Sequence, residues 1–242
     1  DENGFERKRN FMIQISNLSK KYGETVVFSD LNYTFENACI YGLVGRNGAG
    51  KTTLLNILSN YDKNYTGVIS IDRKKMNKVD YLDMPVAYAM DQPSFFNELT
   101  IYENLLLIAS SRKIKKQEAF DKIERILDGL GLKKYENYSP LELSKGTMQR
   151  LNNACAMIQE EKITIFDEPF SGLDPVQMKL LENVIVEFHK KEKGIYIISS
   201  HDIECLQNVC DKCLLLHNGQ IREINTEEVD REKIAKILSE GE

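Results

Sequence analysis

A glycine-rich segment, Gly45 to Thr52, has the residue types and spacing needed to hold the phosphates of a nucleoside triphosphate. Two glycines with four residues between them are followed by Lys51 and Thr52. In such a loop the backbone N–H groups approach the phosphates, Lys51 neutralises the β and γ phosphates, and Thr52 offers its hydroxyl to Mg²⁺. We therefore expect Mg-ATP to bind here, at Gly45, Arg46, Asn47, Gly48, Ala49, Gly50, Lys51, Thr52 and the adjacent Thr53.

A pair of carboxylates, Asp167 and Glu168, ends a largely apolar run that begins at Ile163. Carboxylates at the end of a strand are often only solvated caps, but in a chain with a phosphate loop they fit two roles. Asp167 would hold the shell of Mg²⁺, and Glu168 would polarise a water molecule aimed at the γ-phosphate. We expect Asp167 and Thr52 to be metal residues and Glu168 to be catalytic.

The elements on either side of the glycine-rich segment have the pattern that a phosphate loop requires. The apolar run 40–44 predicts a buried strand that enters the loop, and Leu54, Leu55, Ile57 and Leu58 give the helix that leaves it an apolar face. A strand, a loop and a helix in this order disfavour a plain glycine turn.

The rest of the chain alternates between strand and helix patterns, which indicates an α/β fold. Strand-like spacing before residue 41 predicts an antiparallel β layer, interrupted by a turn at Tyr22-Gly23-Glu24, and the periodicity becomes helical between about 93 and 150. We expect a P-loop NTPase with a mostly parallel core sheet, an N-terminal antiparallel β subdomain and an inserted helical subdomain. Residues 1–10 form a polar extension in this prediction, and 11–242 form one domain.

Composition argues against several classes of function. With a net charge of -5 and a pI of about 5.5, the chain has no global basic field, so we expect no nucleic-acid partner. No apolar run approaches the roughly 18 residues that cross a bilayer, and we expect a soluble chain. Five cysteines, an odd number in a chain of this length, favour a reducing compartment.

Two of these cysteines, Cys210 and Cys213, have the spacing of a metal site, with Cys205 and His217 nearby. However, Cys213 begins an apolar run that is typical of a buried strand, and the sequence has no second cysteine pair. We expect core cysteines here rather than metal ligands.

A third segment, Leu143-Ser144-Lys145-Gly146-Thr147-Met148-Gln149-Arg150, lies just before an apolar helix. With it the chain resembles the nucleotide-binding subunit of an ABC transporter, whose signature usually reads LSGGQ. The resemblance implies a head-to-tail dimer in which Ser144 and Gly146 contact the ATP held by the other subunit's loop. Lys145 and Thr147 depart from the usual Gly and Gln; alone, this segment would be read as a helix N-cap.

Further residues fall in the order that this family shows, so that the resemblance covers roughly Met12 to Glu223. It implies that Tyr22 stacks on adenine and that Gln92 reaches both Mg²⁺ and the attacking water. It also implies that the loop Ser171–Asp174 crosses the dimer interface, with Asp174 near the nucleotide, and that His201 holds the γ-phosphate. An isolated Tyr before a turn is usually only packed, and a lone His is often a surface or capping residue.

The resemblance implies an ATPase subunit that drives a separately encoded integral-membrane permease from the cytoplasmic face of the membrane, as a homodimer or paired with a similar subunit. Phe95 or Phe96, after Gln92, is then the expected contact with the permease. The lysine in the signature and the short C-terminal tail resemble exporters more than sugar importers.

Two other functions are compatible with an ABC ATPase. A soluble member acting in translation or chromosome maintenance would have two cassettes or long coiled coils, and this sequence has neither. A regulatory cassette that does not hydrolyse ATP is disfavoured because Lys51, Asp167, Glu168 and His201 are all present.

Overall fold

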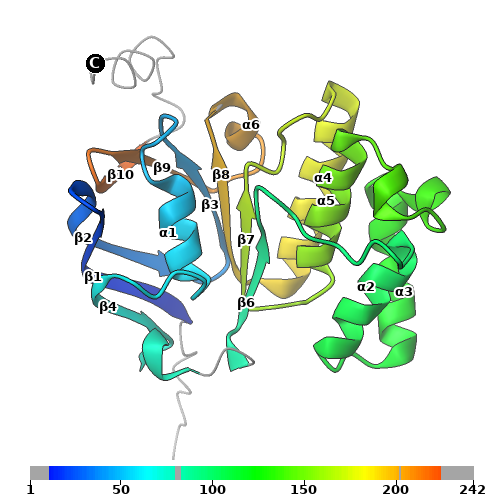
Figure 1. The fold of residues 1–242 in the computed structure, drawn as a ribbon, viewed down its shortest axis with the longest axis horizontal. Helices are drawn as coiled ribbons and strands as arrows, with labels where there is room; N and C mark the ends of the chain where they lie inside the picture. The colour runs from blue at the N-terminus through cyan, green and yellow to red at the C-terminus, as the bar shows by residue number, and fades with distance from the viewer. Residues whose placement is uncertain (1–10, 80–82, 202, 225–242) are drawn as a thin grey trace, which may run out of the picture.

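The structure, a computed structural model, describes residues 11–79, 83–201 and 203–224. The polar extension expected at 1–10 lies outside the described residues, as does the part of the expected domain beyond 224. The described residues form two sheets with helices around them, a mixed α/β fold (Figure 1).

The central sheet has the strand order β10-β9-β3-β8-β7-β6. Its strands are β3 (Cys39–Val44), β6 (Val86–Ala89), β7 (Ile163–Asp167), β8 (Ile195–Ser200), β9 (Lys212–His217) and β10 (Gln220–Ile224). Only β10 pairs antiparallel among the described strands of this sheet. Every residue of β3, β7 and β8 is buried, as expected for parallel strands that are covered on both faces. The predicted mostly parallel core sheet is confirmed, and its parallel strands all end at one edge.

The N-terminal layer is an antiparallel sheet with the order β2-β1-β4-β5. Its strands are β1 (Met12–Tyr22), β2 (Thr25–Glu36), β4 (Thr66–Ile71) and β5 (Lys74–Lys75). Helix α1 (Lys51–Leu58) lies between this sheet and the central one (Figure 1). One buried apolar cluster joins Ile13 and Phe35 of the N-terminal layer with Leu54 of α1 and Ile197 of β8. The two sheets therefore pack around the helix that follows the phosphate loop.

The remaining helices are α2 (Ile101–Ser111), α3 (Lys116–Gly129), α4 (Lys145–Met157), α5 (Pro175–Glu192) and α6 (Ile203–Gln207), with 3-10 helices η1 (Met76–Lys78), η3 (Lys133–Tyr135) and η4 (Pro140–Glu142). Local signals start two of them, because Thr100 and Asp174 each form a capping box at the start of α2 and α5. Helices α4 and α5 cover the face of the central sheet opposite α1, and α2 and α3 lie beyond them (Figure 1).

Helix α4 continues past residue 150, where we expected the helical insert to end. It begins at Lys145 and runs to Met157. It packs onto β6 and β7, and Leu151 and Ala154 belong to the buried cluster that includes residues of these two strands. The apolar face of one continuous helix thus joins the helical part to the core, so a boundary at 150 would cut a helix.

Candidate functional site

The phosphate loop joins β3 to α1 at the edge of the central sheet where the parallel strands end. Gly48 and Gly50 have φ values of 82° and 99°, in the left-handed region that favours glycine. Gly50 also touches the N-terminal layer, since a Cβ at this position would lie 2.7 Å from Val27 Cγ1. Helix α1 begins directly at Lys51, so its positive end faces the loop.

The ammonium group of Lys51 is buried at the centre of the loop. Its Nζ donates to the carbonyl oxygens of Gly45 at 2.7 Å and Arg46 at 3.3 Å. The same Nζ lies 3.6 Å from Glu168 Oε1. A cation is therefore held beside the carboxylate that the sequence predicts to be catalytic.

A pocket of about 500 Å³ opens over the loop and brings distant parts of the chain together. Ten of the predicted site residues line it, namely Tyr22, Arg46, Asn47, Gly48, Gly50, Lys51, Thr52, Thr53, Glu168 and His201. Gly45, Ala49 and Asp167 belong to the same loop and strand end but do not line the pocket. Four residues that we had not assigned to the site complete the lining, namely Thr25, Val27, Asp91 and Ser171.

Ser199, near the end of β8, fixes the two carboxylate residues at the end of β7. Its hydroxyl donates to Asp167 Oδ1 and accepts from the backbone N–H of Glu168 at 2.9 Å. Strands β7 and β8 pair in parallel with Asp167 opposite Ser199. The sequence pattern did not predict this role of Ser199, because it depends on the register between strands that are far apart in the chain.

Asp167 is fully buried beneath the pocket. Burial raises the pKa of its carboxyl above the ordinary value, although hydrogen bonds with Ser199 and Thr52 oppose that shift. The hydroxyl of Tyr88 also donates to Asp167 Oδ2, at 3.4 Å. A buried carboxylate beside the Thr52 hydroxyl is an oxygen donor set of the kind that Mg²⁺ prefers, so these residues fit the expected ion.

Glu168 is held in a backbone conformation that a residue with a side chain rarely adopts, with φ of 50°. The Gln149 side chain donates to its carbonyl oxygen at 3.3 Å, and Ser199 accepts from its N–H. Its Oε2 lies 2.9 Å from His201 Nδ1. The structure therefore brings the predicted catalytic Glu168 and His201 into direct contact, with Lys51 on the other carboxylate oxygen.

Gln92 is placed differently from its neighbours. It is exposed and does not line the pocket, whereas Asp91 beside it does. Both follow β6, which pairs in parallel with β7, so the end of β6 lies beside the end of β7. A carboxylate at the end of the neighbouring parallel strand was the signal by which the sequence could have indicated Asp91.

Ser144, Gly146 and Asp174 lie outside this pocket. Ser144 is the N-cap of α4 and accepts from Thr147 N at 3.2 Å, and Asp174 is the N-cap of α5 and accepts from Gln177 N at 2.8 Å. Gly146 packs against the loop before α5, since a Cβ here would lie 2.9 Å from the carbonyl oxygen of Gly172. The signature segment thus sits against the loop Ser171–Asp174, whose first residue lines the pocket.

The two departures from the usual signature have different environments. Lys145 is exposed, and its stem runs alongside Gly172. Thr147 is buried, and its hydroxyl shares a hydrogen bond of 2.9 Å with Ser144 Oγ and accepts from Arg150 Nη2 at 3.2 Å. Arg150 in turn donates to the carbonyl oxygen of Leu130 at 2.7 Å. Thr147 therefore joins the signature to the end of α3.

Cys213 lies in a buried strand, as its apolar run predicted. Cys213 is buried within β9, Cys205 is buried on α6, and Cys210 is partly buried. Burial raises the pKa of the Cys213 thiol to about 11, which disfavours the thiolate that binds metals.

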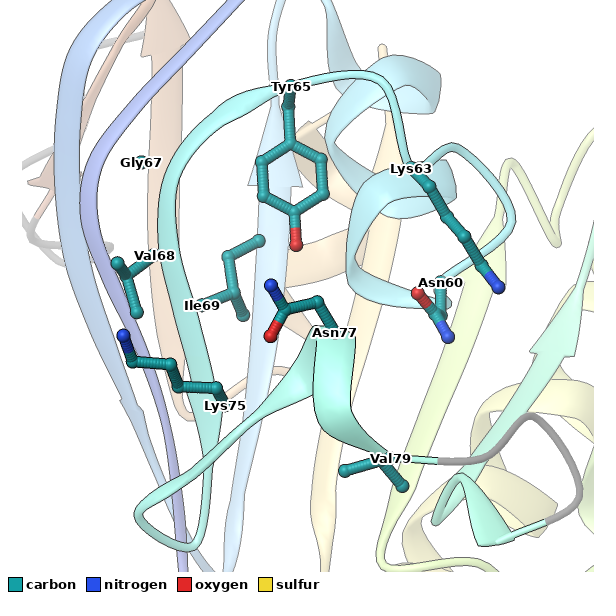
Figure 2. Close-up of a pocket in the computed structure, with 9 residues that line it drawn as sticks. All are labelled: Asn60, Lys63, Tyr65, Gly67, Val68, Ile69, Lys75, Asn77 and Val79. Atoms are coloured by element: carbon teal, nitrogen blue, oxygen red, sulfur yellow. The ribbon is translucent and has the colours of Figure 1, made fainter.

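A second hollow, of about 310 Å³, lies beside β4 and β5 at the edge of the N-terminal layer (Figure 2). Asn60, Lys63 and Tyr65 line it from the connection between α1 and β4, and Lys75 and Asn77 line it from the segment after β4. It contains none of the predicted site residues. The connection 59–65 is nevertheless relevant to the site, because Asp62 in it accepts a hydrogen bond from the Tyr22 hydroxyl.

Among the described residues, no helix combines the length and the apolar character needed to cross a membrane.

Comparisons with known proteins agree with this geometry. The family model described as ABC transporter matches residues 28–171. An uncharacterized ABC transporter ATP-binding protein of Methanocaldococcus jannaschii is 32% identical over 86% of this chain and 75% of its own length. The bacitracin transport ATP-binding protein of Enterococcus faecalis is 30% identical over 91% and 71%. The tungstate uptake system ATP-binding protein of Peptoclostridium acidaminophilum is 30% identical over 87% and 97%.

A solved structure, that of an ATP binding subunit of an ABC transporter, superposes with a TM-score of 0.83 at 26% identity. The alignment covers 95% of this chain and 98% of that one. The likeness therefore extends over both sheets and the helices described above.

Proposed function

Because the chain belongs to the ABC transporter family, whose model matches more than half of it, we propose that it powers a separately encoded membrane permease. ATP binding and ATP hydrolysis follow from the family itself. The partner, the dimer, the metal ion and the direction of transport are the parts that we propose. The observation that supports this proposal most strongly is the position of Glu168, whose carboxylate lies between Lys51 Nζ and His201 Nδ1 at the phosphate loop.

We assign the steps of hydrolysis to residues of the pocket and of the strand ends beside it. The loop and the positive end of α1 bind the phosphates, and Lys51 leaves its carbonyl partners to meet them. Thr52 and Asp167 would hold Mg²⁺, which supplies charge neutralisation of the phosphates when it is bound. Glu168 orients a water molecule and accepts its proton, and His201 contacts the γ-phosphate. Gln92 would have to turn inward to reach the water and the ion.

A purified-chain assay tests this assignment. We expect phosphate release from ATP with Mg²⁺ present, and little release when EDTA replaces it. Lys51→Ala should weaken ATP binding, whereas Lys63→Ala, a matched change outside the pocket, should leave it unchanged. Equal effects of the two substitutions would contradict the assignment.

We propose that two copies, or this chain and a similar subunit, form a head-to-tail dimer. Ser144 is exposed at the start of α4, and Gly146 and Asp174 flank the loop whose Ser171 lines the pocket. This loop thus links the two functional surfaces of one chain. In the dimer, Ser144 and Gly146 would complete the pocket of the partner.

Complementation between variants tests the dimer. Lys51→Ala damages the phosphate loop, and Ser144→Arg damages the signature, so each variant alone should be inactive. A mixed dimer would combine the intact loop of one chain with the intact signature of the other. We expect the mixture to regain hydrolysis; no recovery on mixing would contradict composite sites.

The permease contact that we propose is an apolar surface around Phe96, on the cytoplasmic face of the membrane. Phe96 is 59% exposed and Leu141 is 76% exposed. Phe95, which packs against the core, and Leu141 line a hollow of about 280 Å³. Exposed aromatic residues next to a pocket are typical anchors of a protein interface.

Co-purification tests this surface. Phe96→Ala should reduce recovery of the cognate permease, and Phe95→Ala should do the same. Phe120→Ala, which removes an exposed aromatic side chain of α3, is the matched control and should have no effect. Unchanged recovery with both Phe95→Ala and Phe96→Ala would contradict the proposed surface.

For the direction of transport we propose export, on the basis of the lysine-containing signature. The relatives include a bacitracin transport protein and a tungstate uptake protein at equal identity. Inside-out vesicles that contain the cognate permease decide the direction: ATP-driven substrate accumulation supports export, and accumulation only in right-side-out vesicles contradicts it.

A further inference from the structure

Tyr22 lines the nucleotide pocket, and two charged residues outside the pocket, Lys20 and Asp62, contact its side chain. Tyr22 is 53% exposed, lies at the end of β1, and lines the pocket. Its hydroxyl donates to Asp62 Oδ2 at 3.1 Å, and Lys20 Nζ lies 4.5 Å from the centre of its ring. Neither Lys20 nor Asp62 lines the pocket.

Lys20 is fully engaged in this arrangement. It is 4% exposed, a burial that an ammonium group tolerates only when it is paired. Its Nζ forms an ion pair of 2.7 Å with Asp62 Oδ2 and donates to the carbonyl oxygen of Asn64 at 2.6 Å. The face of the Tyr22 ring is the third contact of this group.

Asp62 is likewise held from several sides. Asn64 N donates to its Oδ1 at 2.9 Å, and its own backbone N–H donates to Asn56 O at 2.9 Å, in the last turns of α1. Partial burial raises the pKa of Asp62, but the hydrogen bonds from Lys20, Asn64 and Tyr22 outweigh it and lower the pKa below its ordinary value. The acceptor for the Tyr22 hydroxyl is therefore a charged carboxylate at neutral pH.

The connection 59–65 thereby links the phosphate loop, through α1, to Tyr22. It leaves α1, whose first residue is Lys51, and turns back toward the N-terminal layer (Figure 2). Asp62 in this connection bonds Tyr22, so the helix that begins at the phosphate loop also supports the aromatic side chain. With eight residues, α1 spans about 12 Å.

We infer that Lys20 and Asp62 are positioning residues that hold the Tyr22 ring in place for stacking on the base of the bound nucleotide. This inference rests on the proposed function, since it takes Tyr22 as the residue that meets the base. An exposed side chain loses rotational freedom when it stacks, and a ring that is already fixed loses less. Because every base has a face on which an aromatic ring can stack, the effect extends to ATP and GTP alike.

A double-mutant cycle on nucleotide affinity tests the inference. Tyr22→Phe keeps the ring and removes the hydroxyl, and Asp62→Ala removes the acceptor. Each should weaken ATP binding about three- to tenfold, and the double variant should bind no more weakly than the weaker single variant. Asp62→Asn, which keeps an acceptor oxygen, should bind ATP more tightly than Asp62→Ala. Glu24→Ala removes a nearby exposed carboxylate and should change nothing.

Inorganic tripolyphosphate, which has no base, separates positioning from a general structural role. Its affinity should stay within about twofold of wild type in every variant of the cycle. The inference is overturned if Tyr22→Phe and Asp62→Ala bind ATP as wild type does, if their losses multiply, or if tripolyphosphate binding falls in parallel. Tyr22→Ala separates the stacking role of Tyr22 from its positioning by Lys20 and Asp62. Unchanged ATP binding by Tyr22→Ala would contradict the stacking role itself. If Tyr22→Ala weakens ATP binding but Tyr22→Phe and Asp62→Ala do not, only the positioning role is overturned.

Discussion

Glu168 Oε2 lies 2.9 Å from His201 Nδ1, although the two residues come from the ends of different strands. Glu168 follows β7, His201 follows β8, and the two strands pair in parallel, which brings their ends together. The contact places a residue that can hold a phosphate beside the residue that can accept a proton from water. Their distance thus supports a shared role in hydrolysis.

Substitution of His201 tests that shared role. His201→Ala should lower the maximal rate of phosphate release about 10²–10³-fold, the usual cost of losing one donor to a reacting phosphate or oxyanion. ATP affinity should change much less, because Lys51 and the loop remain. His217→Gln, at the end of β9 and outside the pocket, should be neutral for both quantities. A variant at position 201 with wild-type turnover would contradict the assigned role.

Asp167→Asn should stabilise the nucleotide-free protein at neutral pH. The pKa of Asp167 is raised in the folded state by burial, so its charge opposes folding above the folded pKa, and that cost disappears as the pH falls below the unfolded value near 4. We therefore expect the melting temperature of the variant to lie above that of wild type at pH 7.

The effect of Asp167→Asn should also depend on pH and on Mg²⁺. Its advantage over wild type should shrink as the pH is lowered from 7 toward 4, and Mg²⁺ should no longer strengthen ATP binding. Thermal melts across that pH range check the first point, and titrations with and without Mg²⁺ check the second. An advantage that stays constant with pH would show that the carboxylate charge is not its cause.

Thr147→Val should destabilise the protein far more than Lys145→Ala, although both positions depart from the usual signature. The buried Thr147 hydroxyl bonds Ser144 and Arg150, and its loss leaves a buried guanidinium donor without that partner, a cost of about 1–3 kcal/mol. Lys145 is exposed, and its substitution should change the free energy of unfolding by no more than about 0.5 kcal/mol. Denaturant unfolding of both variants gives the comparison, and equal losses would show that the Thr147 hydroxyl does not hold this region.

Sequence alone predicted the local elements that position the candidate site. The segment Gly45 to Thr52 lies where strand, loop and helix were expected, because glycine spacing and apolar periodicity are local signals. Asp167 and Glu168 likewise end a buried strand. The order of the central strands was not predictable in detail, since it depends on pairings between distant segments.

The parts that sequence did not predict depend on such pairings. Ser199 bonds Asp167 and Glu168 only because β7 and β8 are in that register. Asp91, rather than Gln92, lines the pocket, and residue type alone does not decide between two adjacent polar residues at the end of a strand. The sequence shows Thr147 only as a departure from the usual signature. Its buried hydrogen bond with Arg150 could not be predicted, because Arg150 is held by the end of α3, which is distant in the chain.

The most direct test of the account is Glu168→Gln in the purified protein, because the proposal assigns hydrolysis, but not binding, to this carboxylate. We predict unchanged or stronger ATP binding, a loss of about 10²–10⁴ in phosphate release, and an ATP-dependent dimer by light scattering. Glu118→Gln, an exposed change in α3, is the matched control and should behave as wild type. Undiminished ATP turnover by the Glu168→Gln variant would contradict the central claim.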